Sequence, residues 1–411
     1  MRAVQKLSNA PAEVLLIDRQ NYHTFVPLLY QVATGYIEPE AIAIPLRTAL
    51  RNIPNADFLK AEVTKIDFEA QTVLTDGKAV RYDYLVIATG SEANFLQVSG
   101  APHHAFPLRT LDDAVALRHR IMSCLEQAVK NISEEQHPLP LDPLLQERLL
   151  TFTIVGGGPT GVEMAGALQE LLQDCLKQDY PLLDLTQSRV VLLQSGSSLL
   201  ASYPKNLQNH VATQLRRREV KVHFNSKVKA VTDQKVILEN DTAIETATVV
   251  WTAGVAGSLP KTSNEIPTDS KNKVKVTPTL QLAAYPNVYG IGDTAHVKQE
   301  GEPLVGIAPE ALQQGSAIAR NLQRQLAGKP PQDFNYFNKG RAAIVARGVG
   351  VILLLGKIPV GGFFGWFAWL AIHLYYLPGF WNRVRVLTAW LRDIFASDRY
   401  FQQIINGGAR S

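Results

Sequence analysis

At 411 residues the chain is longer than one ordinary domain of roughly 100 to 200 residues, so two or three domains and a large core are expected. Its formal net charge is only +4, and the chain has no basic tract or aromatic-basic stripe, which argues against nucleic-acid binding. The two cysteines, Cys124 and Cys175, lie far apart in segments that read as helical. This argues against a disulfide framework, a Cys-x-x-Cys redox pair and a metal site.

The first nineteen residues read like the second half of a mononucleotide-binding unit. A short helical stretch around Val4 precedes an apolar strand, Val14 to Ile17, which ends in Asp18. In such a unit the acid that closes the second strand follows a glycine-rich turn by about twenty residues. Counting back from Asp18 passes Met1, so we expect a first strand and its glycine turn to precede Met1. The alternative is an ordinary strand that ends in aspartate.

Short apolar runs alternate with helical stretches along most of the chain, a pattern that predicts βαβ units and a doubly wound α/β fold. The expected strands are Val14 to Ile17, Tyr84 to Ala88, Phe152 to Val155, Val190 to Leu193, Thr248 to Trp251 and Val288 to Gly290. Residues 131–143 carry three prolines and no apolar period, which predicts a loop.

The strongest motif is TFTIVGGGPTGVEMAGAL, at 151–168, which has a strand, a glycine turn and a helix in that order. Gly156, Gly158 and Gly161 have the G-x-G-x-x-G spacing, which gives a tight turn, close approach of a pyrophosphate, and close packing of helix on strand. The helix that begins near Pro159 would offer its free N–H groups to the anion. The segment predicts a dinucleotide site.

The second strand of this unit, at 188–196, ends in Gln194 where a carboxylate is usual. A carboxylate bonds the ribose 2′-hydroxyl of NADH and repels the 2′-phosphate of NADPH. Neutral Gln194 should therefore relax discrimination against NADPH. Gln194 lies further from the glycine turn than the usual twenty or so residues, through an extension around 174–185.

The composition changes after about Asn338. Residues 363–377 contain no charge, but at about 1.5 Å per residue they span roughly 22 Å, less than the ~30 Å of a bilayer core. The next stretch is amphipathic: Phe380, Val384, Leu387, Leu391 and Ile394 recur at helical spacing, and Arg385, Arg392 and Arg399 repeat every seven residues on the other face. This pattern favours a helix lying in the headgroup region of an anionic membrane, and the alternative is a core helix with a dimer interface.

Two further segments complete a family resemblance. YDYLVIATGSEANF at 82–95 and YPNVYGIGDTAHV at 285–297 resemble the Ala-Thr-Gly and Gly-Asp motifs of flavoproteins with two dinucleotide-binding domains. With APEALQQG at 308–315 and the aromatic tail, nearly the whole chain resembles type II NADH:quinone oxidoreductases, most closely the bacterial ones. The resemblance implies FAD, NADH, a membrane quinone, no proton pumping, and a monotopic seat on the cytoplasmic face of a bacterial membrane. It also implies a homodimer through the tail.

The resemblance assigns roles to individual residues. It implies that Glu163, which we expect on the first turn of the helix, lies near nicotinamide and flavin, and that Gln313 faces the quinone, while Pro309 replaces a second glutamine of that segment. The residues that it assigns to FAD are Asp18, Val63, Thr89, Gly90, Gly292 and Asp293. Those that it assigns to the nicotinamide nucleotide are Gly156, Gly158, Gly161 and Gly254.

The predicted organisation is two Rossmann-like domains, of the kind found in pyridine nucleotide-disulfide reductases, followed by an amphipathic helical membrane-binding region. The expected parts are an N-terminally incomplete FAD-binding segment at 1–112, an NAD(P)H-binding domain at 113–270, a second FAD-binding segment at 271–338 and the tail at 339–411. One alternative is a flavoprotein like the sulfide:quinone oxidoreductases, which would need reactive cysteines. Another is a truncated, flavin-free nucleotide-binding membrane protein.

Overall fold

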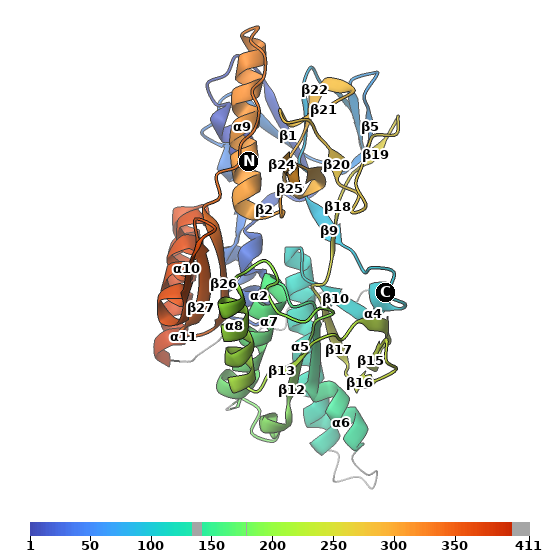
Figure 1. The fold of residues 1–411 in the computed structure, drawn as a ribbon, viewed down its shortest axis with the longest axis vertical. Helices are drawn as coiled ribbons and strands as arrows, with labels where there is room; N and C mark the ends of the chain where they lie inside the picture. The colour runs from blue at the N-terminus through green and yellow to red at the C-terminus, as the bar shows by residue number, and fades with distance from the viewer. Residues whose placement is uncertain (134–141, 178, 397–411) are drawn as a thin grey trace. The chain divides into compact units, whose positions relative to one another are not determined.

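The computed structural model describes residues 1–133, 142–177 and 179–396, and its chain folds into two compact units (Figure 1). Unit 1 contains residues 1–23, 44–92 and 255–339, and unit 2 contains 24–43, 93–254 and 340–411. The chain therefore passes between the units five times, after residues 23, 43, 92, 254 and 339. Segment 24–43 groups with the glycine-rich segment rather than with the N-terminal residues that flank it.

Unit 1 is built from short strands and one long helix, α9. Its helices are α1 Arg2–Lys6, α3 Leu46–Leu50 and α9 Ala308–Leu326, with a 3₁₀ turn η6 at Gly292–Thr294. Its strands are β1 Val14–Asp18, β4 Ala56–Lys60, β5 Val63–Asp67, β6 Thr72–Thr75, β7 Ala79–Arg81, β8 Leu85–Ile87, β18 Val255–Gly257, β19 Lys261–Thr262, β20 Val274–Lys275, β21 Gln281–Leu282, β22 Tyr285–Gly290, β23 Ala295–His296, β24 Lys298–Gln299 and β25 Glu302–Pro303.

The strands of unit 1 pair in several small sheets. Strand β1 runs parallel to β4, with Val14 opposite Ala56, and β22 runs parallel to β8, with Gly290 opposite Ile87. Helix α9 packs on α1, where a side chain at Gly315 would lie 3.3 Å from Arg2 Cβ. The core beneath α9 is apolar and includes Leu7 and Ile318.

Unit 2 is organised around a five-stranded sheet in the order β10-β17-β11-β12-β13, in which every pair is parallel. These strands are β10 Ala105–Pro107, β11 Thr151–Val155, β12 Arg189–Leu193, β13 Lys221–His223 and β17 Thr248–Trp251. All five residues of β11 are buried, as expected for the central strand of a sheet covered on both faces. A separate antiparallel sheet holds β14 Val228–Val231, β15 Lys235–Leu238 and β16 Ala243–Glu245.

The helices of unit 2 alternate with these strands. They are α2 Leu29–Ala33, α4 Ala101–His104, α5 Leu111–Ser133, α6 Pro143–Leu150, α7 Pro159–Glu170 and α8 Lys205–Arg217, with short turns η1 Val26–Leu28, η2 Pro39–Ala41, η4 Leu171–Cys175 and η5 Leu185–Gln187. Three more strands, β2 Tyr22–Thr24, β3 Ala43–Pro45 and β9 Ser91–Ala93, contain points where the chain passes from one unit to the other.

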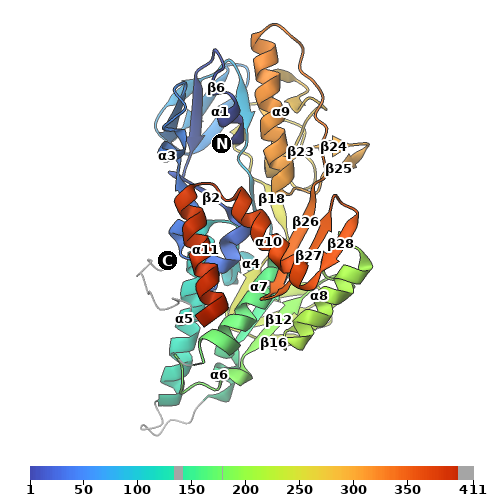
Figure 2. The same cartoon turned by 90° about the vertical axis from the view of Figure 1, so that its left-hand side faces the viewer.

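The C-terminal part of unit 2 begins with strands that the sequence analysis did not predict. An antiparallel sheet of β26 Gly340–Ala346, β27 Val349–Leu354 and β28 Ile358–Gly361 precedes α10 Gly362–Tyr376 and α11 Phe380–Ala396 (Figure 2). Helix α7 approaches β26 closely, because a Cβ at Gly166 would lie 1.6 Å from the Val345 carbonyl oxygen. In the part of the chain that the structure describes, no helix is both long and apolar enough to cross a bilayer.

The predicted strands are confirmed, with bounds shifted by at most a few residues. The loop expected at 131–143 needs correction, since α5 continues to Ser133 and α6 already begins at Pro143. The aspartate Asp142 caps α6 by accepting from the N–H groups of Leu144 and Leu145. The rest of that loop, and Arg399 of the predicted basic repeat, lie outside the described residues.

Candidate active site

The glycine turn between β11 and α7 uses each of its glycines for a different physical reason. A Cβ at Gly156 would lie 2.8 Å from Ala253 Cα, and the residue has φ of +113°. A Cβ at Gly161 would lie 1.8 Å from the Gly156 carbonyl oxygen, so only glycine lets the helix pack on the turn. A Cβ at Gly158 would have no atom within 4 Å, so the backbone there is open to a ligand. No side chain caps α7, which leaves N–H groups at its first turn for an anion.

Gln194, which follows β12, is tied to this turn. The Gly157 N–H donates to Gln194 Oε1 at 2.9 Å. The Gln194 side chain can present its Nε2 donor to a ribose, and its amide oxygen keeps one further lone pair. A donor can bond either a 2′-hydroxyl or a 2′-phosphate, whereas a carboxylate accepts from the first and repels the second.

The segment after β17 lies beside the glycine turn. The Thr252 hydroxyl lies 2.9 Å from the Val155 carbonyl oxygen and 3.1 Å from that of Gly156. From β11 the sheet continues through β12 and β13 in one direction and through β17 and β10 in the other. The carboxyl ends of β11 and β17 therefore form a topological switch point, where ligands bind in open α/β sheets, and Gly254 belongs to this edge.

In unit 1, parallel pairing of β8 with β22 brings together two of the predicted motifs. The Ser91 hydroxyl donates to Asp293 Oδ2 at 2.8 Å, and the Thr89 and Thr294 hydroxyls lie 3.4 Å apart. Gly90 has φ of +73° and nothing within 4 Å of a Cβ position, so the backbone there is open to a ligand. Gly292, with φ of +69°, donates its N–H to Gln314 Oε1 at 2.6 Å.

Asp18 ends β1 and Val63 begins β5, two strands of unit 1 that belong to different sheets. Asp18 Oδ1 accepts the Gln20 N–H at 2.8 Å, and its carbonyl accepts from Ala61, two residues before Val63, at 3.0 Å. The residues assigned to FAD thus form two groups within unit 1. The open backbone at Gly90 and the carboxylate of Asp293 fit the ribityl part of a flavin nucleotide. The glycine turn expected before Met1 stays a prediction.

Glu163 lies deeper in unit 2 than its position in the motif suggests. It is the fifth residue of α7, not a residue of the first turn as expected, and the first turn has no acid. Its Oε1 accepts the Ile344 N–H at 3.3 Å and the Trp369 indole N–H at 3.2 Å. Burial raises the pKa of Glu163 to about 8, although both hydrogen bonds act to lower it. The carboxyl group therefore keeps its proton at neutral pH.

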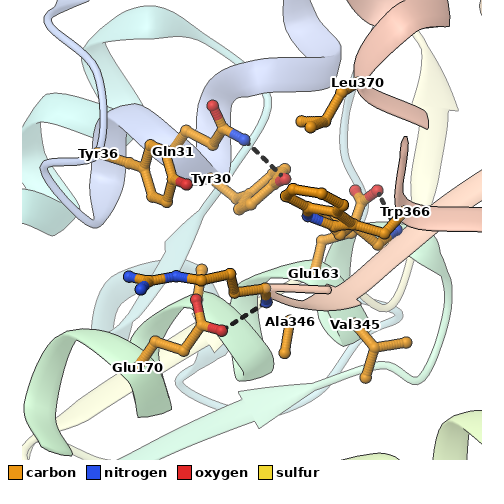
Figure 3. Close-up of a pocket in the computed structure, with 12 residues that line it drawn as sticks. Tyr30, Gln31, Tyr36, Glu163, Glu170, Val345, Ala346, Trp366 and Leu370 are labelled. Atoms are coloured by element: carbon orange, nitrogen blue, oxygen red, sulfur yellow. Dashed lines mark hydrogen bonds between the residues drawn. The ribbon is translucent and has the colours of Figure 1, made fainter. Parts of the chain in front are cut away.

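A small pocket in unit 2 opens beside Glu163 (Figure 3). Tyr30 and Gln31 lie on one side of it, where Gln31 Nε2 donates to the Tyr30 hydroxyl at 3.0 Å. The full lining is Tyr30, Gln31, Tyr36, Glu163, Ala167, Glu170, Ile344, Val345, Ala346, Arg347, Trp366 and Leu370. The pocket thus combines segments from 30–36, 163–170, 344–347 and 366–370, which are far apart in the sequence.

Two acids line this pocket in different environments. Glu170 Oε1 accepts the Arg347 N–H at 2.6 Å and forms an ion pair with Arg218 at 3.5 Å. The partners of Glu163 are the neutral donors of Ile344 and Trp369. Glu170 thus has a cationic partner, whereas the carboxyl group of Glu163 has only neutral ones.

The C-terminal helices contact the pocket through polar side chains. The Tyr36 hydroxyl donates to Asp393 Oδ2 at 2.6 Å, and Asp393 pairs with Arg347 at 3.0 Å. The Trp390 indole donates to Gln31 Oε1 at 2.9 Å. The C-terminal half of α11 is therefore docked on the same segments that line the pocket.

Trp369 connects Glu163 to the rest of α10. Its side chain is fully buried, and its ring stacks on His373 with centroids 3.8 Å apart. His373 Nδ1 lies 2.7 Å from the Trp369 carbonyl oxygen, and burial lowers the pKa of His373 to about 4. The imidazole is therefore neutral, and its Nδ1–H donates to that carbonyl. The sequence analysis missed Trp369, because nothing in a run of aromatic residues shows which one meets the glycine-motif helix.

Gln313, the residue assigned to the quinone, has both ends of its amide engaged. It donates to the Phe337 carbonyl at 2.9 Å and accepts the Phe337 N–H at 3.0 Å. Its buried neighbour Gln314 instead reaches Gly292 of the flavin motif. The sequence analysis missed Gln314, although the four-residue spacing of the buried residues Glu310, Gln314 and Ile318 on α9 could have indicated it.

The cysteines offer little to a sulfide-oxidising alternative. Cys124 is fully buried on α5, with Sγ 3.4 Å from the Thr248 hydroxyl, and burial raises the pKa of its thiol. Cys175 is half-buried at the end of η4. A buried thiol with a raised pKa is a poor nucleophile. Among the described residues, no cluster of His, Cys, Asp and Glu could hold a metal ion.

Helices α10 and α11 expose large apolar side chains. Trp381 is 71% exposed and Phe364 75% exposed. The exposed residues of this apolar face are Phe363, Phe364, Phe367, Tyr375, Phe380, Trp381, Leu387, Leu391 and Phe395. The buried face of α11 is formed by Val386, Trp390 and Asp393, so the helix has one side that packs on the protein and an apolar side that no element among the described residues covers.

Comparison with known proteins agrees with these motifs. Residues 1–315 match the family model of pyridine nucleotide-disulphide oxidoreductases. Ndh of Mycobacterium tuberculosis, a type II NADH:quinone oxidoreductase, is 36% identical over 97% of this chain and 86% of its own length. NdhA, a second enzyme of that name from the same organism, is 34% identical over 95% of this chain and 84% of its own length.

Solved structures show the same fold. NDH2 from Plasmodium falciparum, solved in complex with NADH, has a TM-score of 0.86 at 19% identity, covering 98% of this chain and 97% of that chain. The sulfide:quinone oxidoreductase of Aquifex aeolicus has a TM-score of 0.70 at 19% identity, covering 96% and 92%. At this identity the structures establish the fold alone. The sequence relatives establish more, and the chain belongs to the family of type II NADH:quinone oxidoreductases.

Proposed function

We propose that this protein oxidises NADH or NADPH and reduces a membrane quinone through bound FAD, without moving protons across the membrane. The balanced reaction consumes NADH, one proton and a quinone, and yields NAD⁺ and a quinol. The chain must therefore bind a dinucleotide, hold a flavin, supply one proton and meet a quinone. Each requirement has a candidate group of residues in the structure.

The nucleotide site of unit 2 is the observation that carries the proposal. The open backbone at Gly158, in front of an uncapped helix, provides N–H groups for the pyrophosphate. Gln194 faces the adenosine ribose with a donor, so NADPH should support more than about one percent of the catalytic efficiency of NADH. Steady-state kinetics with both nucleotides tests this, and a lower ratio would refute the role of Gln194.

The flavin site lies in unit 1. Thr89, Gly90, Gly292 and Asp293 would hold the ribityl end, and Gln314 fixes the Gly292 backbone for it. Asp18 and Val63 would meet the adenosine end. When bound, FAD supplies the chemistry of accepting a hydride and passing on two electrons.

Glu163 supplies the proton in this proposal. Its carboxyl group is protonated at neutral pH and lies beside a pocket, which suits a residue that gives up one proton per turnover. The hydrogen bonds from Ile344 and Trp369 hold Oε1, so Oε2 is the atom that would carry the proton. For Gln313, a role at the quinone would require its amide to leave the Phe337 backbone.

The membrane seat is proposed on α10 and α11. Their exposed aromatic residues would enter the interface, and exposed Arg385 and Arg392 would meet anionic headgroups. We place the protein on the cytoplasmic face of a bacterial membrane, and a homodimer through the tail stays a prediction. Co-sedimentation with anionic vesicles tests this proposal, and equal recovery of a Phe364→Ser/Trp381→Ser variant would contradict it.

The experiment for the whole proposal uses the purified full chain after incubation with FAD. Absorbance in the flavin region measures bound FAD, and quinone-dependent oxidation of NADH measures activity. Bound flavin without quinone-dependent oxidation would refute the proposed reaction, and failure to retain flavin would favour the flavin-free alternative. A Cys124→Ser/Cys175→Ser variant with unchanged quinone reduction would exclude sulfide-type chemistry.

A further inference from the structure

A tight turn beside the nucleotide site of unit 2 holds two residues in an unfavourable backbone conformation. Leu96 has φ of +51° and Gln97 has φ of +59°, and the Val98 N–H donates to the Phe95 carbonyl at 2.9 Å. This is the arrangement of a type I′ turn, whose two central positions favour Asn and Gly. A leucine there is less favourable than a glycine, because its Cβ crowds the following carbonyl oxygen in the left-handed conformation.

The surroundings force this conformation on the turn. Asn94 Oδ1 accepts the Leu96 N–H at 2.8 Å, and the Asn94 carbonyl accepts from the Trp251 indole at 2.9 Å. The Phe95 ring packs on that of Trp251, with centroids 5.6 Å apart. The Leu96 side chain itself adds little packing to this turn, because the residue is 55% exposed.

Leu96 lies at the switch point of the sheet, next to Gly254. A Cβ at Gly254 would lie 3.3 Å from Leu96 Cδ2 and 3.4 Å from Leu96 Cγ, so the leucine rests directly on the Gly254 backbone. Asn94 fixes the same segment through a hydrogen bond from its N–H to the Gly254 carbonyl at 3.1 Å. An exposed apolar side chain held under strain at a ligand-binding edge indicates a contact with the ligand.

The topology decides which half of the dinucleotide lies there. The pyrophosphate binds at the turn between β11 and α7, and the adenosine half extends toward Gln194 after β12. The other half must extend to the opposite side of the switch point, over β17 and Gly254. We propose that Leu96 packs against the nicotinamide half of NADH, an inference that rests on the proposed function of this site.

Two glycine substitutions separate the contact from the strain. Leu96→Gly and Gln97→Gly each place a glycine at one of the two positions with positive φ and so relieve the backbone strain there. Only Leu96→Gly removes the apolar side chain. We expect Leu96→Gly to raise the Kd for NADH roughly fivefold to tenfold, with a melting temperature equal to or a few degrees above that of the unchanged protein. Gln97→Gly should leave the Kd within about twofold, and Leu96→Met should restore most of the lost affinity.

The measurement is direct binding of NADH, by anaerobic calorimetry, to the full chain whose bound FAD has been reduced beforehand, so that the nucleotide cannot be oxidised, with 5′-AMP as the probe of the adenosine half. Leu96→Gly should leave 5′-AMP binding unchanged. Equal Kd values for NADH in both glycine variants, or equal weakening of NADH and 5′-AMP in Leu96→Gly, would overturn the inference. If the unchanged protein bound 5′-AMP but no NADH, the proposed function would fail together with it.

Discussion

The glycine turn and the pocket around Glu163 lie on the same helix, α7, but they are built in opposite ways. In the turn, one decisive contact joins residues five positions apart, since a side chain at Gly161 would strike the Gly156 carbonyl. In the pocket, Glu163 is held by Ile344 and Trp369, which are 181 and 206 residues away in the sequence. The first is a local solution to binding an anion. The second depends on the C-terminal region packing on the nucleotide-binding unit.

The largest effect should follow a change in the turn itself. We expect Gly161→Ala to lower the stability of unit 2 by roughly 2 to 4 kcal/mol, because the new Cβ can be placed only by shifting the backbone. NADH-dependent activity should be lost with it. Thermal unfolding and steady-state kinetics measure the two effects.

Gly158→Ala is the matched control within the same motif. Its Cβ would meet no atom within 4 Å, so the melting temperature should stay the same. The methyl group would nonetheless occupy the approach of the pyrophosphate, so the KM for NADH should rise roughly tenfold. If Gly158→Ala were as destabilising as Gly161→Ala, the division of roles among these glycines would be wrong.

The contrast also explains what could be predicted from the sequence. The strands β11, β12 and β17 and the glycine turn were predicted because apolar runs and glycine spacing are local signals. The three strands of the C-terminal sheet were not, since their residues read as part of an aromatic, membrane-directed segment. Gln313 was chosen over Gln314 from a motif, and only the orientation of α9 shows which of them faces Gly292.

The second largest effect should come from Glu163, the residue shared by the motif and the pocket. Glu163→Gln can still accept the hydrogen bonds of Ile344 and Trp369 but cannot release a proton. We expect kcat to fall roughly 100-fold at neutral pH, as for other positioned acids. The rate of the unchanged protein should decline above about pH 8, where the carboxyl group loses its proton, and this decline should be missing in the variant.

The same substitution has a consequence for stability. The pKa of Glu163 is about 8 in the folded protein and near 4.5 when unfolded, so between these values the folded state binds more protons. Stability contributed by this group therefore falls as pH rises from about 5 to about 8. The melting temperature of Glu163→Gln should fall less over this range than that of the unchanged protein. If the two proteins gave parallel curves of melting temperature against pH, Glu163 would already be ionised in the folded state at the low end of the range.

A smaller effect should follow a change in the long-range contact alone. Trp369→Phe keeps the aromatic packing against His373 but removes the indole donor to Glu163 Oε1. Loss of one hydrogen bond of about 1 kcal/mol should lower kcat roughly fivefold. It should also raise the pKa of Glu163 further, because that bond favours the charged form, so the alkaline decline of activity should move to higher pH.

Trp366→Phe is the comparison for this last variant, since Trp366 lies on the same helix and lines the pocket beside Glu163, whereas the indole that donates to Glu163 is that of Trp369. Both substitutions remove an indole, but only Trp369→Phe should move the alkaline limb of the pH profile. A shift of equal size in both variants would mean that the pocket responds to packing in general. A shift confined to Trp369→Phe would mean that the C-terminal helix tunes a residue of the glycine-motif helix through a single hydrogen bond.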